Sequence, residues 1–481
     1  MSESDIRFFR NNRNTPVVVY LCSLSQTKNV QLLFHLFLKH TLHILVGFFY
    51  RYSRRIHVTG EENVPHGVPL LLCSNHPNAF MDAIIVGMTV KRRSWFLVRS
   101  DVFRKKWMAA AFEFIGMLPI YRLQEGVKNL AKNDETFARC TAMLERKKAI
   151  IIFSEGLCIQ ERRLRKLKKG TARIAFTAED ANNFQLGLQI VPVGINYSST
   201  PWKFRTTVHV RFGKPFAAAD YAEVYRESPA KAVTQLTREL ETRMAQEIVI
   251  IDNKADDELV NGLEEMFLRD YARELKLNPG NQKETHIVSV KLAQIANSLS
   301  TENPDAAEKL RANVKDYLKR VHELGIRDWN LRPSSIEKMG SKDVLADAVF
   351  FTLGFPVWVF GVITNYIPYK VPYLITQKIV RNIEWHASLN ATIGAFMWLI
   401  CWGLESLAVA LLFRNWWVLA AFMIAMPVSG MFAQYYYVRI RRSNGKGALL
   451  KAMRSDKAEV TALVELRNEI EALVSLRLRS V

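Results

Sequence analysis

The sequence predicts an α/β fold with a mainly parallel sheet flanked by helices, plus a polar helical region and a C-terminal α-helical transmembrane region. Three observations lead to this prediction. Between residues 57 and 217, short apolar runs alternate with helical stretches, as in domains built from strand–helix repeats. Residues 218–343 are polar and helical in pattern. Residues 344–442 are strongly apolar over lengths that can cross a membrane.

The composition indicates a chain of several domains that meets an anionic partner. Its 481 residues are 49% hydrophobic, which is ample for a large core, and they carry a formal net charge of +20. Such a charge usually meets nucleic acid or an anionic membrane surface. We expect membrane lipids and no nucleic acid, because apolar segments are present and base-reading motifs are not apparent.

The cysteines are scattered along the chain. None forms a Cys-x-x-Cys pair, and their positions are Cys22, Cys73, Cys140, Cys158 and Cys401. This spacing suggests neither a disulfide framework nor a zinc site, so we expect no bound metal and a reducing environment.

Residues 1–56 contain the first apolar segment, at 30–50, which is long enough to cross a bilayer. Polar side chains interrupt it at helical spacing: His35, Lys39, His40 and His43. This pattern favours an amphipathic, membrane-associating helix in the interface over a transmembrane span. Basic residues follow it and would pair with lipid headgroups: Arg51, Arg54 and Arg55.

Residues 57–217 are expected to form the α/β domain. The apolar runs that predict its strands are 69–73, 95–98, 148–153 and 188–197, with helical stretches at 126–147 and 170–182. In such sheets ligands bind outside the carboxyl ends of the strands. His76 and Glu155, which both follow a predicted strand, are therefore candidate site residues.

His76 and Asp82 form the first candidate pair. A histidine can accept a proton near neutral pH, and a carboxylate behind it can stabilise the imidazolium. On one continuous helix, residues six apart would lie about 240° apart around the axis, so the segment must turn before its helix begins. We expect Pro77 near the first helical position. Taken alone the pair is a weak signal, because a lone histidine is more often structural.

Four short segments in a fixed order carry more information than this pair. They are Ser74-Asn75-His76-Pro77-Asn78-Ala79-Phe80-Met81-Asp82, Gly116-Met117-Leu118-Pro119-Ile120-Tyr121-Arg122, Ile150-Ile151-Ile152-Phe153-Ser154-Glu155-Gly156 and Ile190-Val191-Pro192-Val193-Gly194-Ile195-Asn196-Tyr197. This order resembles the glycerolipid acyltransferase superfamily, the PlsC-like phospholipid/glycerol acyltransferases. Five residues separate His76 from Asp82 where most of the family has four, which is similar to the glycerol-3-phosphate and dihydroxyacetone-phosphate acyltransferase branch.

The resemblance implies an enzyme of phospholipid biosynthesis that moves a fatty acyl chain from a thioester to a hydroxyl group. The acceptor would be glycerol-3-phosphate or 1-acylglycerol-3-phosphate. The co-substrate would be the thioester of acyl-CoA or acyl carrier protein, and no cofactor would be bound. His76 would be the general base and Asp82 its orienting partner. No serine or cysteine placed for a covalent intermediate is evident.

The resemblance also suggests residues that bind the acceptor. Arg122 would hold its phosphate, because a guanidinium can bond a phosphate at two places. Glu155 and Gly156 match positions that bind the glycerol part, and Ser154, where the family usually has proline, could donate a hydrogen bond. The alternatives are that Arg122 is an ordinary cation among 66 Lys and Arg, and that Glu155-Gly156 is an ordinary turn.

A basic run from Arg162 to Arg173 follows these segments. Runs of this kind usually form a solvated or headgroup-facing surface. The sharper hypothesis is a docking strip for the anionic acyl donor or for the acceptor's phosphate. The polar region 218–343 allows the same two interpretations, solvated helices or a docking surface.

Residues 344–442 are expected to be transmembrane or re-entrant. Two stretches of spanning length, Ala391–Phe413 and Trp416–Val438, are separated only by Arg414-Asn415, which predicts a helical hairpin. Basic residues flank both outer ends, so we expect a membrane protein facing the cytoplasm. Prolines interrupt 344–376, which favours a re-entrant or broken helical hairpin over a third straight span. Residues 443–481 predict a C-terminal amphipathic helix.

Two other functions stay open at this point. One is acylation of other lysophospholipids or of lyso-aminolipids. The other is a membrane scaffold that binds lipid without turnover. An intact set of His76, Asp82, Arg122 and Glu155 argues against the scaffold.

Overall fold

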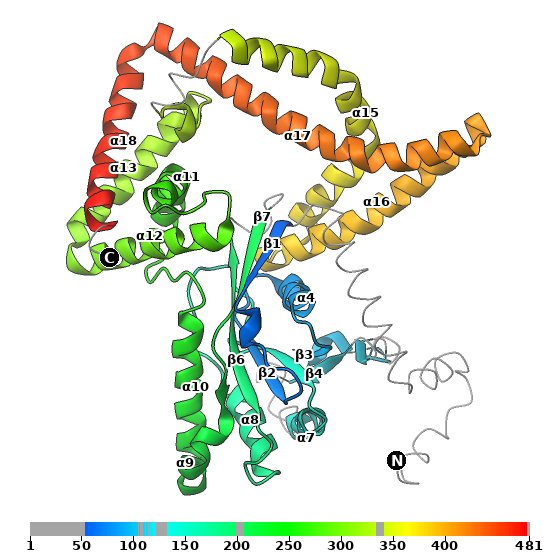
Figure 1. Cartoon of the computed structure of the whole chain (residues 1–481), viewed down its shortest axis with the longest axis vertical. Coiled ribbons are helices and arrows are strands. Elements are labelled where there is room, and N and C mark those ends of the chain that lie inside the picture. Colours follow the sequence, from blue (N-terminus) through cyan, green and yellow to red (C-terminus); the bar gives the residue numbers. More distant parts are fainter. Residues whose placement is uncertain are drawn as a thin grey trace.

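The structure is a computed structural model of the chain. It describes residues 53–478 except 104, 106–108, 111, 114–115, 122–131, 199–205 and 333–340. The interfacial helix predicted at 30–50 lies outside the described residues. Figure 1 shows a sheet with its covering helices, a helical body above it, and three long helices that extend to one side.

The sheet confirms the predicted fold class. Its strands are β1 (Ser53–Thr59), β2 (Leu70–Ser74), β3 (Ser94–Arg99), β4 (Met117–Ile120), β5 (Ala149–Phe153), β6 (Gln189–Tyr197), β7 (Thr206–Phe212) and β8 (Phe216–Ala217). The order is β1-β7-β6-β2-β5-β3-β4, with β8 beside β6. Among the described strands, β7 and β8 run antiparallel to β6, and every other pair is parallel.

The central strands are apolar on both faces because helices cover both sides of the sheet. In β2, Leu71 and Cys73 face one core while Leu70 and Leu72 face the other, as the two-residue period of a strand requires. The helices α7 (Lys132–Glu145), α8 (Gly170–Asp180) and α10 (Pro229–Ala245) complete the first core. The helix α4 (Ala79–Thr89) completes the second.

The predicted end of the α/β domain at residue 217 is wrong. Leu236, Leu240 and Met244 of α10 are buried in the same core as β2. Their helical spacing forms an apolar face that has to be covered, and the sheet covers it. Four short helices also belong to the α/β domain: η1 (Glu61–Asn63), η2 (Ser100–Phe103), η4 (Ala218–Tyr221) and α9 (Ala222–Glu227). A fifth, η5 (Asp328–Asn330), follows later in the chain, next to the helical body described below.

A helical body with its own core follows α10. It consists of α11 (Asp256–Glu274), α12 (Gln282–Glu302), α13 (Pro304–Glu323) and α18 (Lys457–Leu478). The predicted C-terminal amphipathic helix is α18, and its apolar face packs into this body. Buried Arg467 of α18 pairs with fully buried Asp328 at 2.8 Å. The end of the chain therefore returns to the side of α11–α13.

Within the described residues, three helices are long and apolar enough to cross a membrane: α15 (Ser341–Ile379), α16 (Ile383–Phe413) and α17 (Trp416–Ser455). The turn between α16 and α17 falls on the two predicted residues. Arg414 takes a left-handed conformation with φ 47°, and the Asn415 side chain accepts from Trp417 N. This αL residue ends α16 and reverses the chain.

The helix α15 corrects the predicted break, because it is continuous through Pro356, Pro368 and Pro372. It is bent rather than interrupted (Figure 1), as prolines inside a helix cause. Its first half runs antiparallel to α17. Asp347 pairs with Arg439 at 2.8 Å near the start of α15.

The second half of α15 runs antiparallel to α16 instead. In the middle of the helix, Asn365 donates to Met426 O at 3.2 Å and accepts from Trp398 Nε1 at 3.2 Å. Near its end, Gln377 Nε2 lies 3.1 Å from His386 Nδ1. Both ends of α15 therefore lie toward the open end of the α16–α17 hairpin. The re-entrant alternative for this helix stays a prediction.

Candidate active site

The turn between β2 and α4 brings His76 and Asp82 together. The strand ends at Ser74 and the helix begins at Ala79, so Pro77 lies two residues before the first helical position. His76 Nδ1 is 3.0 Å from Asp82 Oδ2. The Asp82 side chain is fully buried, whereas that of His76 is 18% exposed. The predicted contact is present because the chain turns before the helix starts.

Two further donors hold the Asp82 carboxylate. Asn78 N donates to Oδ2 at 2.6 Å, and the Tyr197 hydroxyl donates to Oδ1. A buried carboxylate needs such partners, since it is costly to bury one without them. Tyr197 lies at the end of β6, inside the fourth sequence segment, but no role was predicted for it.

The His76 ring is held on several sides. It stacks on Phe153 with ring centroids 3.9 Å apart and an interplanar angle of 17°. The backbone carbonyl of His76 accepts a hydrogen bond from Ile159 N at 3.1 Å. Because Nδ1 faces the carboxylate, the other ring nitrogen carries the lone pair. In the described part of the chain, Nε2 has no hydrogen-bond partner and can meet a substrate.

Glu155 joins the His76 turn to the loop after β5. Its carboxyl oxygens accept from His76 N at 3.2 Å and from Arg165 N at 3.4 Å. Burial raises the pKa of Glu155, and the two backbone N–H groups partly offset this. Gly156 follows with φ 67°, and a Cβ there would lie 3.0 Å from Lys168 Cγ. The left-handed backbone conformation favours glycine here, and a Cβ would also need the Lys168 side chain to shift slightly.

Ser154 follows β5 directly and lies inside the protein. Its side chain is buried, and its hydroxyl shares a 3.0 Å hydrogen bond with Thr171 Oγ1 of α8. Its predicted contact with the acceptor stays a prediction. Arg122 lies outside the described residues, and its phosphate contact stays a prediction.

The basic run after Gly156 divides into two parts. Arg162 bonds Glu264 of α11 through two nitrogens, at 2.9 and 2.8 Å, and Arg163 bonds Asp257 at 2.7 Å. These two cations fasten the α/β domain to the helical body rather than forming a docking strip. The exposed remainder is Arg165, Lys166, Lys168, Lys169 and Arg173.

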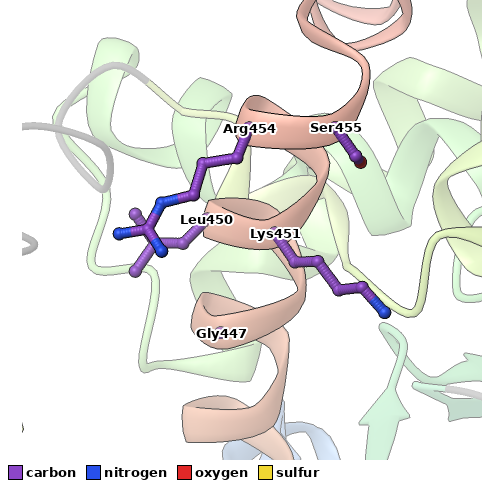
Figure 2. A pocket seen from close by; sticks show the side chains of 5 residues that line it. All are labelled: Gly447, Leu450, Lys451, Arg454 and Ser455. Carbon is purple, nitrogen blue, oxygen red and sulfur yellow. The ribbon is translucent and has the colours of Figure 1, made fainter.

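A pocket of about 460 Å³ lies elsewhere, on α17 (Figure 2). Its lining residues are Gly447, Leu450, Lys451, Arg454 and Ser455. All of them belong to a single helix, and none comes from the β2–α4 turn or from the loop after β5. This pocket is therefore not the candidate active site.

The chain is similar to known proteins, and one family model matches the segment that forms this site. Residues 55–196 match the family model described as Acyltransferase. Over 100 residues the chain is 30% identical to glycerol-3-phosphate O-acyltransferase 2 of Saccharomyces cerevisiae. This match covers 18% of this chain and only 14% of the yeast protein.

A solved structure is also similar, the crystal structure of the 1-acyl-sn-glycerophosphate (LPA) acyltransferase PlsC from Thermotoga maritima. The TM-score is 0.31 and the identity 16%, over 47% of this chain and 88% of that one. The family match includes both His76 and Asp82. Residues 55–196 are therefore the part of the chain that is similar to the acyltransferase family.

Proposed function

We propose that the chain is a membrane-bound O-acyltransferase acting on glycerol-3-phosphate or 1-acylglycerol-3-phosphate, with acyl-CoA or an acyl carrier protein thioester as donor. The observation that carries the proposal is the 3.0 Å contact between His76 Nδ1 and the buried Asp82 carboxylate. This contact leaves Nε2 available to accept a proton. The family match and the name of the yeast relative support the class of reaction and acceptor.

In the proposed reaction His76 acts directly on the acceptor. Its Nε2 accepts the proton of the acceptor hydroxyl while that oxygen attacks the carbonyl carbon of the thioester. The carbonyl oxygen becomes an oxyanion, and its collapse re-forms the double bond and breaks the C–S bond. The departing thiolate takes the proton back from the imidazolium. Asp82 stabilises the imidazolium while it exists and keeps the ring in the productive tautomer.

Membrane binding follows from the three long apolar helices. Their side chains are mostly exposed, and a bilayer is the solvent that would cover them. Because α18 packs with α11–α13, the segments before and after these helices lie on one side. Basic residues collect where α17 leaves the apolar region: Arg439, Arg441, Arg442 and Lys446. By the positive-inside rule we assign that side to the cytoplasm.

The acceptor's phosphate is assigned to Arg122. We expect Arg122→Ala to raise the KM for a phosphate acceptor. The rise should correspond to a loss of about 1–3 kcal/mol in binding free energy, the usual cost of losing a hydrogen bond to a charged group. Arg146→Ala is the matched control, because Arg146 is exposed on the same domain. An acceptor KM that changes equally in both variants would remove this role.

An acceptor panel tests the function. The purified protein in lipid nanodiscs is incubated with radiolabelled acyl-CoA or acyl carrier protein thioester and with glycerol-3-phosphate, 1-acylglycerol-3-phosphate, other lysophospholipids or lyso-aminolipids. We expect product from a phosphate acceptor in wild type and none in His76→Ala. Product from phosphate-free acceptors alone would contradict the proposed substrate. Lipid binding without product from any acceptor would indicate the non-catalytic scaffold.

A further inference from the structure

The helix that carries Asp82 is capped from outside its own segment. Asn78 is the N-cap residue of α4, yet its side chain makes no capping hydrogen bond. The first N–H groups of a helix have no partner within it and must be satisfied elsewhere. In α4, Ala79 N donates to Cys158 Sγ at 2.8 Å and Met81 N donates to Ser388 Oγ at 3.3 Å.

Ser388 belongs to α16, 307 positions after Met81. It is fully buried, and its hydroxyl also donates to Asn78 Oδ1 at 3.4 Å. Met81 is the third residue of α4, and its N–H is one that an N-cap side chain usually bonds. A serine from one of the long apolar helices therefore performs the capping that Asn78 does not.

The Asn78 side chain is used toward the catalytic pair instead. Its Nδ2 donates to the Tyr197 hydroxyl at 3.5 Å, and that hydroxyl donates to Asp82. Its backbone N donates directly to Asp82 at 2.6 Å. A continuous chain of hydrogen bonds thus runs from Ser388 through Asn78 to Asp82 and His76.

The backbone at the start of α4 needs this support. Ala79 has φ 25°, in the left-handed region that residues other than glycine rarely adopt. Such a conformation persists only where its surroundings hold it. The start of α16 packs here as well, since Ala387 is buried in the same core as α4 and the Trp385 ring lies 6.2 Å from that of Phe80.

We propose that Ser388 is a positioning residue for the His76–Asp82 pair, through which α16 holds the first turn of α4 in its active conformation. This inference rests on the proposed function, because it needs His76 to be the base. Ser388 itself touches neither reacting group. Its effect reaches them through Asn78 and the α4 backbone, so transfer depends on how α16 is seated against the α/β domain.

The first test compares Ser388→Ala, Ser388→Thr and Thr392→Ala in nanodiscs. Thr392 is one turn further along α16, and within the described residues its hydroxyl bonds only the Ser388 carbonyl of its own helix, at 2.9 Å. We expect Ser388→Ala to lower kcat about tenfold, as for one lost hydrogen bond in a network, with little change in acceptor KM. Ser388→Thr, which keeps the hydroxyl, restores most of kcat, and Thr392→Ala behaves as wild type.

A double-mutant cycle tests the route of the effect. If Ser388 acts through Asn78, the Ser388→Ala and Asn78→Ala double variant has the kcat of Asn78→Ala alone. Additive losses would overturn the route through Asn78 and leave only the contact of Ser388 with the α4 backbone at Met81 N. A wild-type kcat in Ser388→Ala, in a protein that loses transfer in His76→Ala, would overturn the proposal, and the proposed function would then still stand.

A third experiment measures the reactivity of Cys158 instead of acyl transfer. In Ser388→Ala the loosened turn should release Ala79 N from Cys158 and expose that thiol. We expect faster alkylation of Cys158, followed by peptide mass spectrometry, in this variant but not in Thr392→Ala. An unchanged rate would show that Ser388 does not hold the turn. Wild-type protein that acylates no acceptor would overturn the proposed function instead, while this experiment would still decide whether Ser388 supports the turn.

Discussion

Two histidines of one sheet, His76 and His209, have opposite surroundings. His76 follows β2, is partly exposed and faces the Asp82 carboxylate. His209 lies inside β7 and is fully buried, with its Nε2 2.9 Å from Thr59 Oγ1. Its Nδ1 has no hydrogen-bond partner in the described part of the chain. The His286 ring packs edge-on against it, with centroids 5.0 Å apart.

These surroundings decide what each histidine can do. Burial, and after it the nearby His286 and Arg211, lower the pKa of His209 to about 3. Burial and Arg211 likewise lower the pKa of His286 to about 4. Both rings are therefore neutral near pH 7 and serve packing. A carboxylate neighbour and a position at the end of a strand, not the residue type, distinguish the candidate base.

The largest expected effect separates the two histidines directly. His76→Ala should lower kcat by about 10²–10⁴-fold, the usual contribution of a general base, and leave the melting temperature unchanged. His209→Ala should lower the melting temperature and keep kcat for the protein that remains folded. The exposed His66 provides a control that should alter neither quantity. If His76→Ala retained its rate, the two sites would not differ in the way proposed.

Acid should destabilise the fold through the buried pair. The folded-state pKa values of His209 and His286 lie below the ordinary value near 6.5, so between these values the unfolded chain binds more protons. Their contribution is complete above about pH 6.5 and is lost as the pH falls toward 4. At pH 5 this loss is about 2 kcal/mol for each histidine.

Thermal unfolding in detergent at pH 7 and pH 5 measures this loss. His209→Gln should reduce the difference in melting temperature between the two pH values, whereas His66→Gln should leave it unchanged. An equal pH sensitivity in both variants would mean that other groups cause the acid loss.

The smallest expected effect concerns the support of Asp82. Tyr197→Phe removes the hydroxyl that donates to this carboxylate, so kcat should fall about tenfold with acceptor KM nearly constant. Tyr225→Phe on α9 makes the same chemical change away from the site and should leave kcat at the wild-type value. A rise in KM without loss of kcat would place Tyr197 in substrate binding rather than in support of the pair.

Much of the α/β domain could be predicted from local patterns. The apolar runs at 69–73 and 148–153 became β2 and β5, because a strand buried on both faces needs a continuous apolar run. The hairpin turn at Arg414-Asn415 could also be predicted from neighbouring residues. The packing of α10 on the sheet could not be predicted in this way, because a polar helix with one apolar stripe can pack on any apolar surface.

The candidate site divides in the same way. The sequence by itself determined the His76–Asp82 spacing, the strand before it and the turn between them, because these depend on neighbouring residues. Only the tertiary structure decided that Tyr197 supports Asp82 and that Ser388 caps α4. These contacts join residues 115 and 307 positions apart. A hydrogen bond of that kind depends on how whole elements pack, and no local pattern of residues encodes it.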